Sequence, residues 1–259
     1  MPNEVNNQLF YHEAGSLYQP AILFLHGSPL SGRMWKPQLE QLNEFHCLAP
    51  DLPGHGRSAQ IPLDMPSMVQ NLTNLILSST SSGKAHVVGL SFGGVVAQAL
   101  MVARPEVVDH VILSGTSTLM NKWLVNLSML NEPVLRILPP HWLATLLCIQ
   151  FGIPSRYRTI LEEDFKAFSS NTLFEVMKTY LSIEIPSKTK SPTLIVVGQK
   201  ETAFAKWAAR KIASSIPGSK GVVVPNCGHV WNMESPELFT ETVRAWFKGG
   251  SLPIQLRAM

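Results

Sequence analysis

The chain has 259 residues, 45% of them hydrophobic and 15% charged, with a formal net charge of +3 at pH 7. So small a positive charge, without clustered Lys and Arg, argues against nucleic acid as a partner. Cys47, Cys148 and Cys227 lack the paired spacing of a disulfide framework or a zinc site. The N-terminus carries no basic, apolar leader, and no uncharged run is long enough to cross a membrane. We therefore expect a soluble, cytoplasmic protein without a membrane span, monomeric or homodimeric.

Apolar runs along the chain predict strands that alternate with helices. Short apolar runs between turn signals indicate strands at 8–13, Ala21–Leu25, His46–Pro50, 86–90, 107–113, 192–197 and 221–224. Apolar residues at helical spacing indicate helices at 65–77, Phe92–Ala103, 205–215 and Pro236–Phe247. The first two strands would form a short N-terminal hairpin. Strands without polar alternation are typical of a parallel sheet covered by helices, so the pattern predicts a doubly wound α/β fold.

A long interruption separates two of these strands. Between residues 115 and 191, about 75 residues stand where a single crossover helix would be enough. They are too apolar for a disordered loop, and prolines divide them into short segments. We interpret residues 116–190 as a helical cap inserted after the sixth strand, and residues 1–115 and 191–259 as the core.

The stretch Gly89-Leu90-Ser91-Phe92-Gly93 joins a predicted strand directly to a predicted helix. In open α/β sheets the functional crevice lies beyond the carboxyl ends of the strands, which is where this turn falls. Glycines on both sides of Ser91 would let the strand and the helix pack closely around a strained turn and expose its hydroxyl. The pattern G-x-S-x-G is weak alone, but this context predicts that Ser91 is a nucleophile.

A serine needs a base within reach, because its hydroxyl is a poor nucleophile at its free pKa. His46, His86 and His110 fall at the amino ends of their strands, on the wrong side of the sheet. His229 instead lies in a loop directly after strand 221–224, so it is the predicted general base.

The third group should be a carboxylate that orients the imidazole, located after a strand end between Ser91 and His229. Glu201 follows strand 192–197, and no aspartate occurs after Asp164. Glu201 is therefore the predicted acid. Two alternatives remain open: Glu201 is a charge at the N-terminus of the helix 205–215, or Ser91 and His229 act as a dyad.

Backbone N–H groups could stabilise an oxyanion beside Ser91. The amide of Phe92 begins a helix, and the amide of Ser28 follows strand Ala21–Leu25. His26 is expected to brace a loop rather than to catalyse. The loop 51–58, rich in Pro and Gly, offers too few ligands for a metal, so no metal or organic cofactor is expected.

These motifs, taken in chain order, resemble the α/β-hydrolase superfamily, and most of all its capped esterase, lactonase and C–C hydrolase branches. The resemblance rests on His26-Gly27, Trp35, Asp51-Leu52-Pro53-Gly54-His55-Gly56-Arg57-Ser58, Gly89-Leu90-Ser91-Phe92-Gly93-Gly94 and Gly228-His229. It implies the α/β-hydrolase fold and a nucleophile, acid and base at positions 91, 201 and 229. It also implies an oxyanion hole from the amides of Ser28 and Phe92. The chain departs from the family in having Glu201 where Asp is usual and in its short N-terminal hairpin.

The expected function is that of a carboxylesterase-type serine hydrolase that cleaves an ester or another acyl bond of a small hydrophobic substrate through an acyl-enzyme. A serine at position 91 excludes the epoxide hydrolase and haloalkane dehalogenase branches, whose nucleophile is Asp. Trp123, Trp142 and Phe151 are candidate walls of the substrate pocket in the cap. Two alternatives stay open: C–C hydrolase, lyase or perhydrolase chemistry at the same site, and a non-catalytic receptor for a small ligand.

Overall fold

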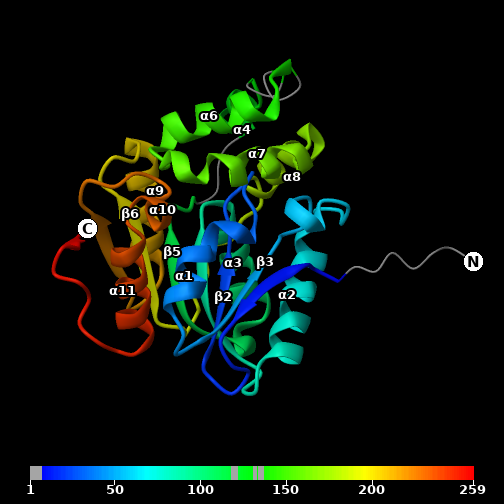
Figure 1. Cartoon of the computed structure of the whole chain (residues 1–259). Helices are drawn as coiled ribbons and strands as arrows, with labels where there is room; N and C mark the ends of the chain where they lie inside the picture. Colours follow the sequence, from blue (N-terminus) through cyan, green and yellow to red (C-terminus); the bar gives the residue numbers. More distant parts are fainter. Residues whose placement is uncertain (1–7, 118–121, 131–132, 134–136) are drawn as a thin grey trace, which may run out of the picture.

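The computed structural model describes residues 8–117, 122–130, 133 and 137–259 (Figure 1). In these residues eight strands form one sheet in the order β1-β3-β2-β4-β5-β6-β7-β8. The strands are β1 (Tyr11–Ala14), β2 (Ala21–Leu25), β3 (His46–Pro50), β4 (Ala85–Leu90), β5 (Val108–Ser114), β6 (Thr193–Gly198), β7 (Lys220–Val224) and β8 (Arg257–Ala258). The six inner strands pair in parallel, and the edge strands β1 and β8 pair antiparallel with β3 and β7. The predicted doubly wound sheet is confirmed.

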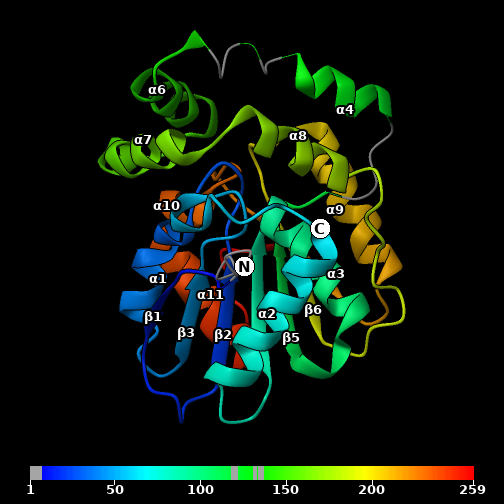
Figure 2. The ribbon, with the colours of Figure 1, turned by 90° about the vertical axis from the view of Figure 1, so that its right-hand side faces the viewer.

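Helices cover both faces of this sheet, as Figures 1 and 2 show. The helices of the core are α1 (Lys36–Gln41), α2 (Met65–Ser79), α3 (Phe92–Ala103), α9 (Ala203–Ser215), α10 (Trp231–Glu234) and α11 (Pro236–Phe247). Leu23 and Leu25 of β2 pack in the cluster that contains α2, α3 and α9, whereas Ile22 and Phe24 pack with Trp35 and α11. Successive residues of a strand face opposite sides, so a strand covered on both faces must be apolar throughout.

Two details of the predicted order are wrong. β1 does not form a hairpin with β2, because it pairs antiparallel with β3 from Tyr11 opposite Pro50 to Ala14 opposite Cys47. The long insertion follows β5, the fifth strand along the described chain, rather than a sixth. β1 instead adds to the side of β3 that is opposite β2.

The segment between β5 and β6 carries four helices in its described part. They are α4 (Lys122–Met129), α6 (Pro140–Phe151), α7 (Arg158–Ala167) and α8 (Ser170–Thr179). Pro140 lies in the first turn of α6, where its missing N–H costs no hydrogen bond, and Gly152 at φ 66° ends the helix. These helices lie over one end of the sheet (Figure 2). They form a layer above the turn that contains Ser91.

A buried ion pair fastens α7 to the core. Asp164 of α7 accepts hydrogen bonds from the guanidinium of Arg33, at 2.7 Å, and from the backbone N–H of Ser31, at 3.0 Å. Arg33 also pairs with the exposed Glu163. Burial raises the pKa of Asp164 to about 6, because loss of hydration outweighs the two hydrogen bonds that favour the charged form.

The Asp164 carboxyl predicts a pH dependence of stability. Its folded pKa lies above the unfolded value, so its contribution is complete below the unfolded pKa and is lost as the pH rises through about 6. Relative to Asp164→Asn, the wild-type free energy of unfolding should therefore fall by about 2–3 kcal/mol between pH 4 and 7.5. Urea denaturation of both proteins at the two pH values measures this change. Glu163→Gln, which alters the exposed partner of the same Arg33, should show no comparable trend.

No helix in the part of the chain that the structure describes is both long enough and apolar enough to cross a membrane.

Candidate active site

Ser91 occupies the strained turn between β4 and α3. Its φ of 55° and ψ of −117° are unusual for a residue with a side chain. A Cβ at position 93 would overlap the carbonyl oxygen of Leu25, and one at position 89 would crowd the backbone of 93 and 94, so these positions require glycine. The Ser91 N–H donates to Ser114 O at 2.9 Å. The turn is thus fixed from both sides, and the Ser91 side chain faces a cavity.

The hydroxyl of Ser91 interacts with the phenol of Tyr180, the residue that follows α8. Tyr180 is 7% exposed, and burial raises its pKa to about 12, so the phenol stays protonated near neutral pH. Sequence reasoning missed this residue. An aromatic side chain at the end of an apolar helix carries no local sign that it will face a serine 89 positions earlier in the chain.

His229 and Glu201 lie together on the loops that follow β7 and β6. His229 Nδ1 is 2.7 Å from Glu201 Oε2, and the backbone N–H of Gly198 donates to Glu201 Oε1 at 2.9 Å. The two loops are joined by a backbone hydrogen bond from Lys200 N to Cys227 O at 2.9 Å. The Glu201 side chain is only 4% exposed, so it contacts protein groups rather than water. The longer Glu side chain therefore reaches the imidazole.

Gly115, directly after β5, makes room for this pair. A Cβ on Gly115 would lie 2.9 Å from His229 Nδ1 and 3.4 Å from Glu201 Oε1. The residue also has a φ of +54°, which side chains disfavour. The backbone of the loop after β5 thus packs directly against the imidazole.

Gly115→Ala should lower kcat by roughly 100-fold, because a displacement of the imidazole by about 1 Å costs that much. The variant should also lose about 1–2 kcal/mol of stability through the positive φ. Gly218→Ala is the matched control, because Gly218 has a φ of +71° and open space around its Cα. That variant should show the stability loss without the loss of kcat. Steady-state kinetics and urea denaturation of both variants distinguish steric displacement from backbone strain.

A second carboxylate lies beside His229. Glu234 accepts hydrogen bonds from the backbone N–H of Gly228, at 3.0 and 3.1 Å, and so holds the loop that carries His229. Burial raises the pKa of Glu234, with Glu201 adding to the effect and Lys200 opposing it. Sequence reasoning missed Glu234. Its spacing of five residues after His229 is a local signal that could have found it.

The backbone at Ser28 lies close to Ser91, since a Cβ on Gly27 would approach Ser91 Cβ to 3.2 Å. The Ser28 hydroxyl is 2.9 Å from His55 Nε2, while His55 Nδ1 is 2.9 Å from Pro53 O. The second contact requires a proton on Nδ1, so Nε2 accepts from Ser28. Burial lowers the pKa of His55 to about 3, so it remains neutral.

Phe92 and His26 lie in the same part of the site as Ser28. Phe92 is the first residue of α3, where the helix itself provides no acceptor for its N–H. His26 is fully buried, and its Nε2 accepts from the backbone N–H of Leu52 at 2.8 Å. His26 therefore braces a loop, as the sequence predicts.

Two cavities meet at Ser91 beneath the helices of the insertion. The first, of about 690 Å³, is lined by Ser28, Phe92 and mainly apolar side chains of α6, α7 and α8. The second, of about 770 Å³, is lined by Glu201, His229 and more polar groups, including Lys200. Ser91 and Tyr180 line both. The arrangement thus offers an apolar arm and a more polar arm on either side of one hydroxyl.

Only some of the candidate wall residues of the substrate pocket line these cavities. Phe151 lines the polar arm, and its ring centroid lies 5.2 Å from that of His229. Trp123 is 68% exposed and Trp142 is 56% exposed, and neither is among the residues that line the two arms. The structure thus places both tryptophans outside the lining of these two cavities. Helical spacing indicates which residues share a face, but it does not tell which face of a cap helix points toward the sheet.

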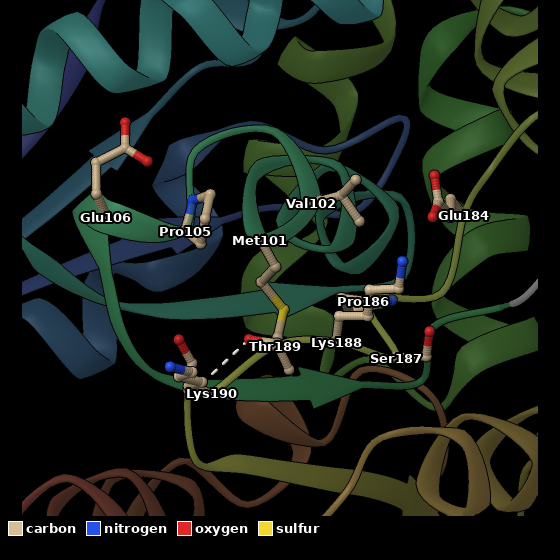
Figure 3. Close-up of a pocket in the computed structure, with 11 residues that line it drawn as sticks. Met101, Val102, Pro105, Glu106, Glu184, Pro186, Ser187, Lys188, Thr189 and Lys190 are labelled. Atoms are coloured by element: carbon tan, nitrogen blue, oxygen red, sulfur yellow. Dashed lines mark hydrogen bonds between the residues drawn. The ribbon is translucent and has the colours of Figure 1, made fainter.

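Figure 3 shows another hollow, which has a volume of about 500 Å³. Its lining includes Met101 and Val102 at the end of α3, Pro105 before β5, and the segment 184–191 that precedes β6. These residues lie at the amino ends of the strands, opposite to the carboxyl ends where Ser91, Glu201 and His229 follow. The crevice rule for α/β sheets therefore favours the cavities at Ser91.

Among the described residues, the candidate metal ligands gather away from Ser91. In the residues with a described position, the group of at least three His, Cys, Asp or Glu close enough to hold an ion is His86, Asp109 and His110. These residues lie at the amino ends of β4 and β5.

Comparison with known proteins adds to this geometry. The profile of the alpha/beta hydrolase family matches residues 22–242. An AB hydrolase superfamily protein of Gibberella zeae is 29% identical over 265 residues, covering 97% of this chain and 88% of that protein. A 2-hydroxy-6-oxo-6-(2'-aminophenyl)hexa-2,4-dienoic acid hydrolase of Metapseudomonas resinovorans is 27% identical, covering 88% of this chain and 83% of that protein.

A solved structure agrees with this relationship. A thermophilic esterase from Thermogutta terrifontis superimposes with a TM-score of 0.74 at 27% identity, covering 93% of each chain. The family match spans most of the sheet and reaches from β2 into α11. The chain therefore belongs to the alpha/beta hydrolase family.

Proposed function

We propose that this protein is a serine hydrolase that cleaves esters with an apolar acyl group through an acyl-enzyme. The carrying observation is the 2.7 Å contact of Glu201 with His229 in a cavity that also contains Ser91. A carboxylate that holds Nδ1–H leaves Nε2 free to accept a proton from the serine. Each member follows the carboxyl end of a different strand.

In the proposed reaction, Ser91 Oγ attacks the ester carbonyl carbon and His229 Nε2 takes its proton. The negative oxygen that forms is stabilised by the backbone N–H groups of Ser28 and Phe92. The bond to the alcohol then breaks, and the imidazolium returns its proton to the leaving oxygen. Water, deprotonated by His229, releases the acid and restores Ser91.

Tyr180 takes part in the first step of the proposed reaction, the attack by Ser91. In the resting protein the Ser91 hydroxyl interacts with the phenol of Tyr180. In the proposed first step, Ser91 Oγ turns from this phenol toward His229 Nε2. Tyr180, neutral near pH 7, can then donate to an oxygen of the substrate.

The residues that line the two arms indicate which part of the substrate each arm binds. The oxyanion donors line the apolar arm, together with Leu143, Leu147 and Phe165, so this arm suits the acyl chain. His229 lines the other arm and must protonate the leaving oxygen, so the alcohol belongs there. Lys200 and Glu234 make that arm more polar, which favours an alcohol that carries further hydrogen-bonding groups.

Two assays test the proposal. A fluorophosphonate probe should label one serine, Ser91, and His229→Ala should abolish the labelling. A series of p-nitrophenyl esters from two to twelve carbons should give kcat/KM values that rise with chain length while the apolar arm fills. Folded protein that is neither labelled nor active would instead support a non-catalytic receptor.

C–C bond hydrolysis remains a second candidate, because one relative of nearly full coverage is a hydrolase of a substituted 2-hydroxy-6-oxohexadienoic acid. A panel of 1,3-diketones, vinylogous diketo acids and esters decides between the two. Turnover of diketones that exceeds that of every ester would favour the C–C reaction at the same Ser91.

A further inference from the structure

A bulge aligns three potential metal ligands at the amino ends of β4 and β5. Ala85 pairs with Val108 but Val87 pairs with Val111, so two steps along β4 match three along β5. Asp109 and His110 fall within this irregularity. Consecutive strand residues normally face opposite sides, and a bulge can turn both toward one neighbour. Here that neighbour is His86 of β4.

Potential ligand atoms of His86 and Asp109 lie close together here. The backbone N–H of His110 makes a long hydrogen bond of 3.4 Å to His86 Nδ1, so this nitrogen carries no proton, and a cation bound there would replace that hydrogen bond at its single lone pair. Asp109 Oδ2, a second acceptor, lies 3.5 Å from the same nitrogen. Tetrahedral ligands ~2.1 Å from a zinc ion are separated by roughly 3.4 Å, so this spacing suits a shared cation.

His110 provides the third donor. Its Nδ1 lies 2.9 Å from Asp109 Oδ1, and the donor atoms of the three residues all lie within 4.8 Å of one another. The His110 side chain is 31% exposed, which leaves it room to rotate toward His86. The ring of His86 stacks on Phe247, with centroids 4.4 Å apart and planes 9° from parallel, so its orientation is set by packing.

We propose that His86, Asp109 and His110 form a binding site for one divalent transition-metal ion, zinc above all, that is separate from Ser91. Two imidazoles and a carboxylate are ligands that Zn²⁺, Ni²⁺ and Cu²⁺ accept, and the exposed side leaves positions for water. The ion would join β4 to β5 and stabilise the folded chain, because the unfolded chain lacks the site.

Titration with metal alone tests the site. Metal-free protein should bind one Zn²⁺ by calorimetry, and one Co²⁺ should give visible d–d absorption. Zn²⁺ should raise the Tm. His110→Ala and Asp109→Ala, both at exposed positions, should each weaken binding by at least ~10-fold, as loss of even an outer-shell partner does. Esterase activity should not change in either variant.

Two controls separate this site from other ligands. His141→Ala removes an exposed histidine elsewhere, and His229→Ala removes the imidazole beside Ser91; both should bind Zn²⁺ like the wild type. Circular dichroism without metal checks that His110→Ala and Asp109→Ala are folded. Absence of a one-to-one complex would overturn the proposal, as would equal affinity in the wild type and folded His110→Ala, or loss of binding in His229→Ala.

Discussion

Replacing Ser91 by alanine is expected to lower kcat for a p-nitrophenyl ester by roughly 10⁴- to 10⁶-fold, the loss that follows removal of a serine nucleophile. The remaining rate would come from the oxyanion donors and from substrate binding alone. Alanine also removes the contact of the Ser91 hydroxyl with Tyr180. The turn keeps its strained φ, because it depends on the glycines at 89 and 93 and on the hydrogen bond to Ser114.

Burst and steady-state kinetics measure this loss, and fluorophosphonate labelling confirms that the wild-type preparation reacts at Ser91. Ser82→Ala, in an exposed turn, should keep full activity. If folded Ser91→Ala keeps a tenth of the wild-type kcat in a preparation free of contaminating esterase, the serine mechanism is wrong. Loss of folding is checked by the Tm, which should change by only a few degrees.

Replacing Glu201 by glutamine is expected to lower kcat by roughly 10⁴-fold, as loss of the orienting carboxylate does in related chemistry. The amide could accept from Nδ1–H through its oxygen, but it carries no charge to stabilise the imidazolium. Its NH₂ group also competes by favouring the wrong tautomer. Glu201→Asp shortens the side chain by about one bond, so the 2.7 Å contact should break and kcat should fall by roughly 10²-fold.

The matched control for this experiment is Glu234→Gln. Glu201 accepts from the imidazole, whereas Glu234, which lines the same arm, accepts from the backbone N–H of Gly228. Its loss should reduce kcat less than tenfold, since an amide oxygen can still accept from that N–H. Equal losses for Glu201→Gln and Glu234→Gln would mean that the two carboxylates share the role of the acid. If Glu201→Gln did not change kcat, the result would support a dyad of Ser91 and His229.

Local sequence signals predicted most of the sheet and the three proposed catalytic residues. The bounds of β2, β3, α3 and α11 agree with those expected, because apolar runs and glycine or proline at their ends depend on neighbours in the chain. Ser91, Glu201 and His229 could be found in the same way. Each directly follows a recognisable strand, and parallel strands bring their carboxyl ends to one edge.

Residues whose role depends on contacts between distant parts of the chain could not be predicted from local sequence signals. Tyr180 meets Ser91 only because the fold brings the end of α8 to the turn after β4, and Trp123 and Trp142 are exposed although they are as apolar as Phe151. The pairing of β1 with β3 likewise depends on which edge of the sheet is free.

The sequence by itself determined the doubly wound class of fold and the chemical groups at the carboxyl edge of its sheet, since both follow from short-range periodicity and strand ends. Only the tertiary structure decided which cap side chains enclose the cavity, how the loops of Glu201 and His229 meet, and that the bulge turns Asp109 and His110 toward His86. The physical reason is that these contacts join residues distant in the chain. Their energies depend on packing and burial in the folded molecule, which no local pattern encodes.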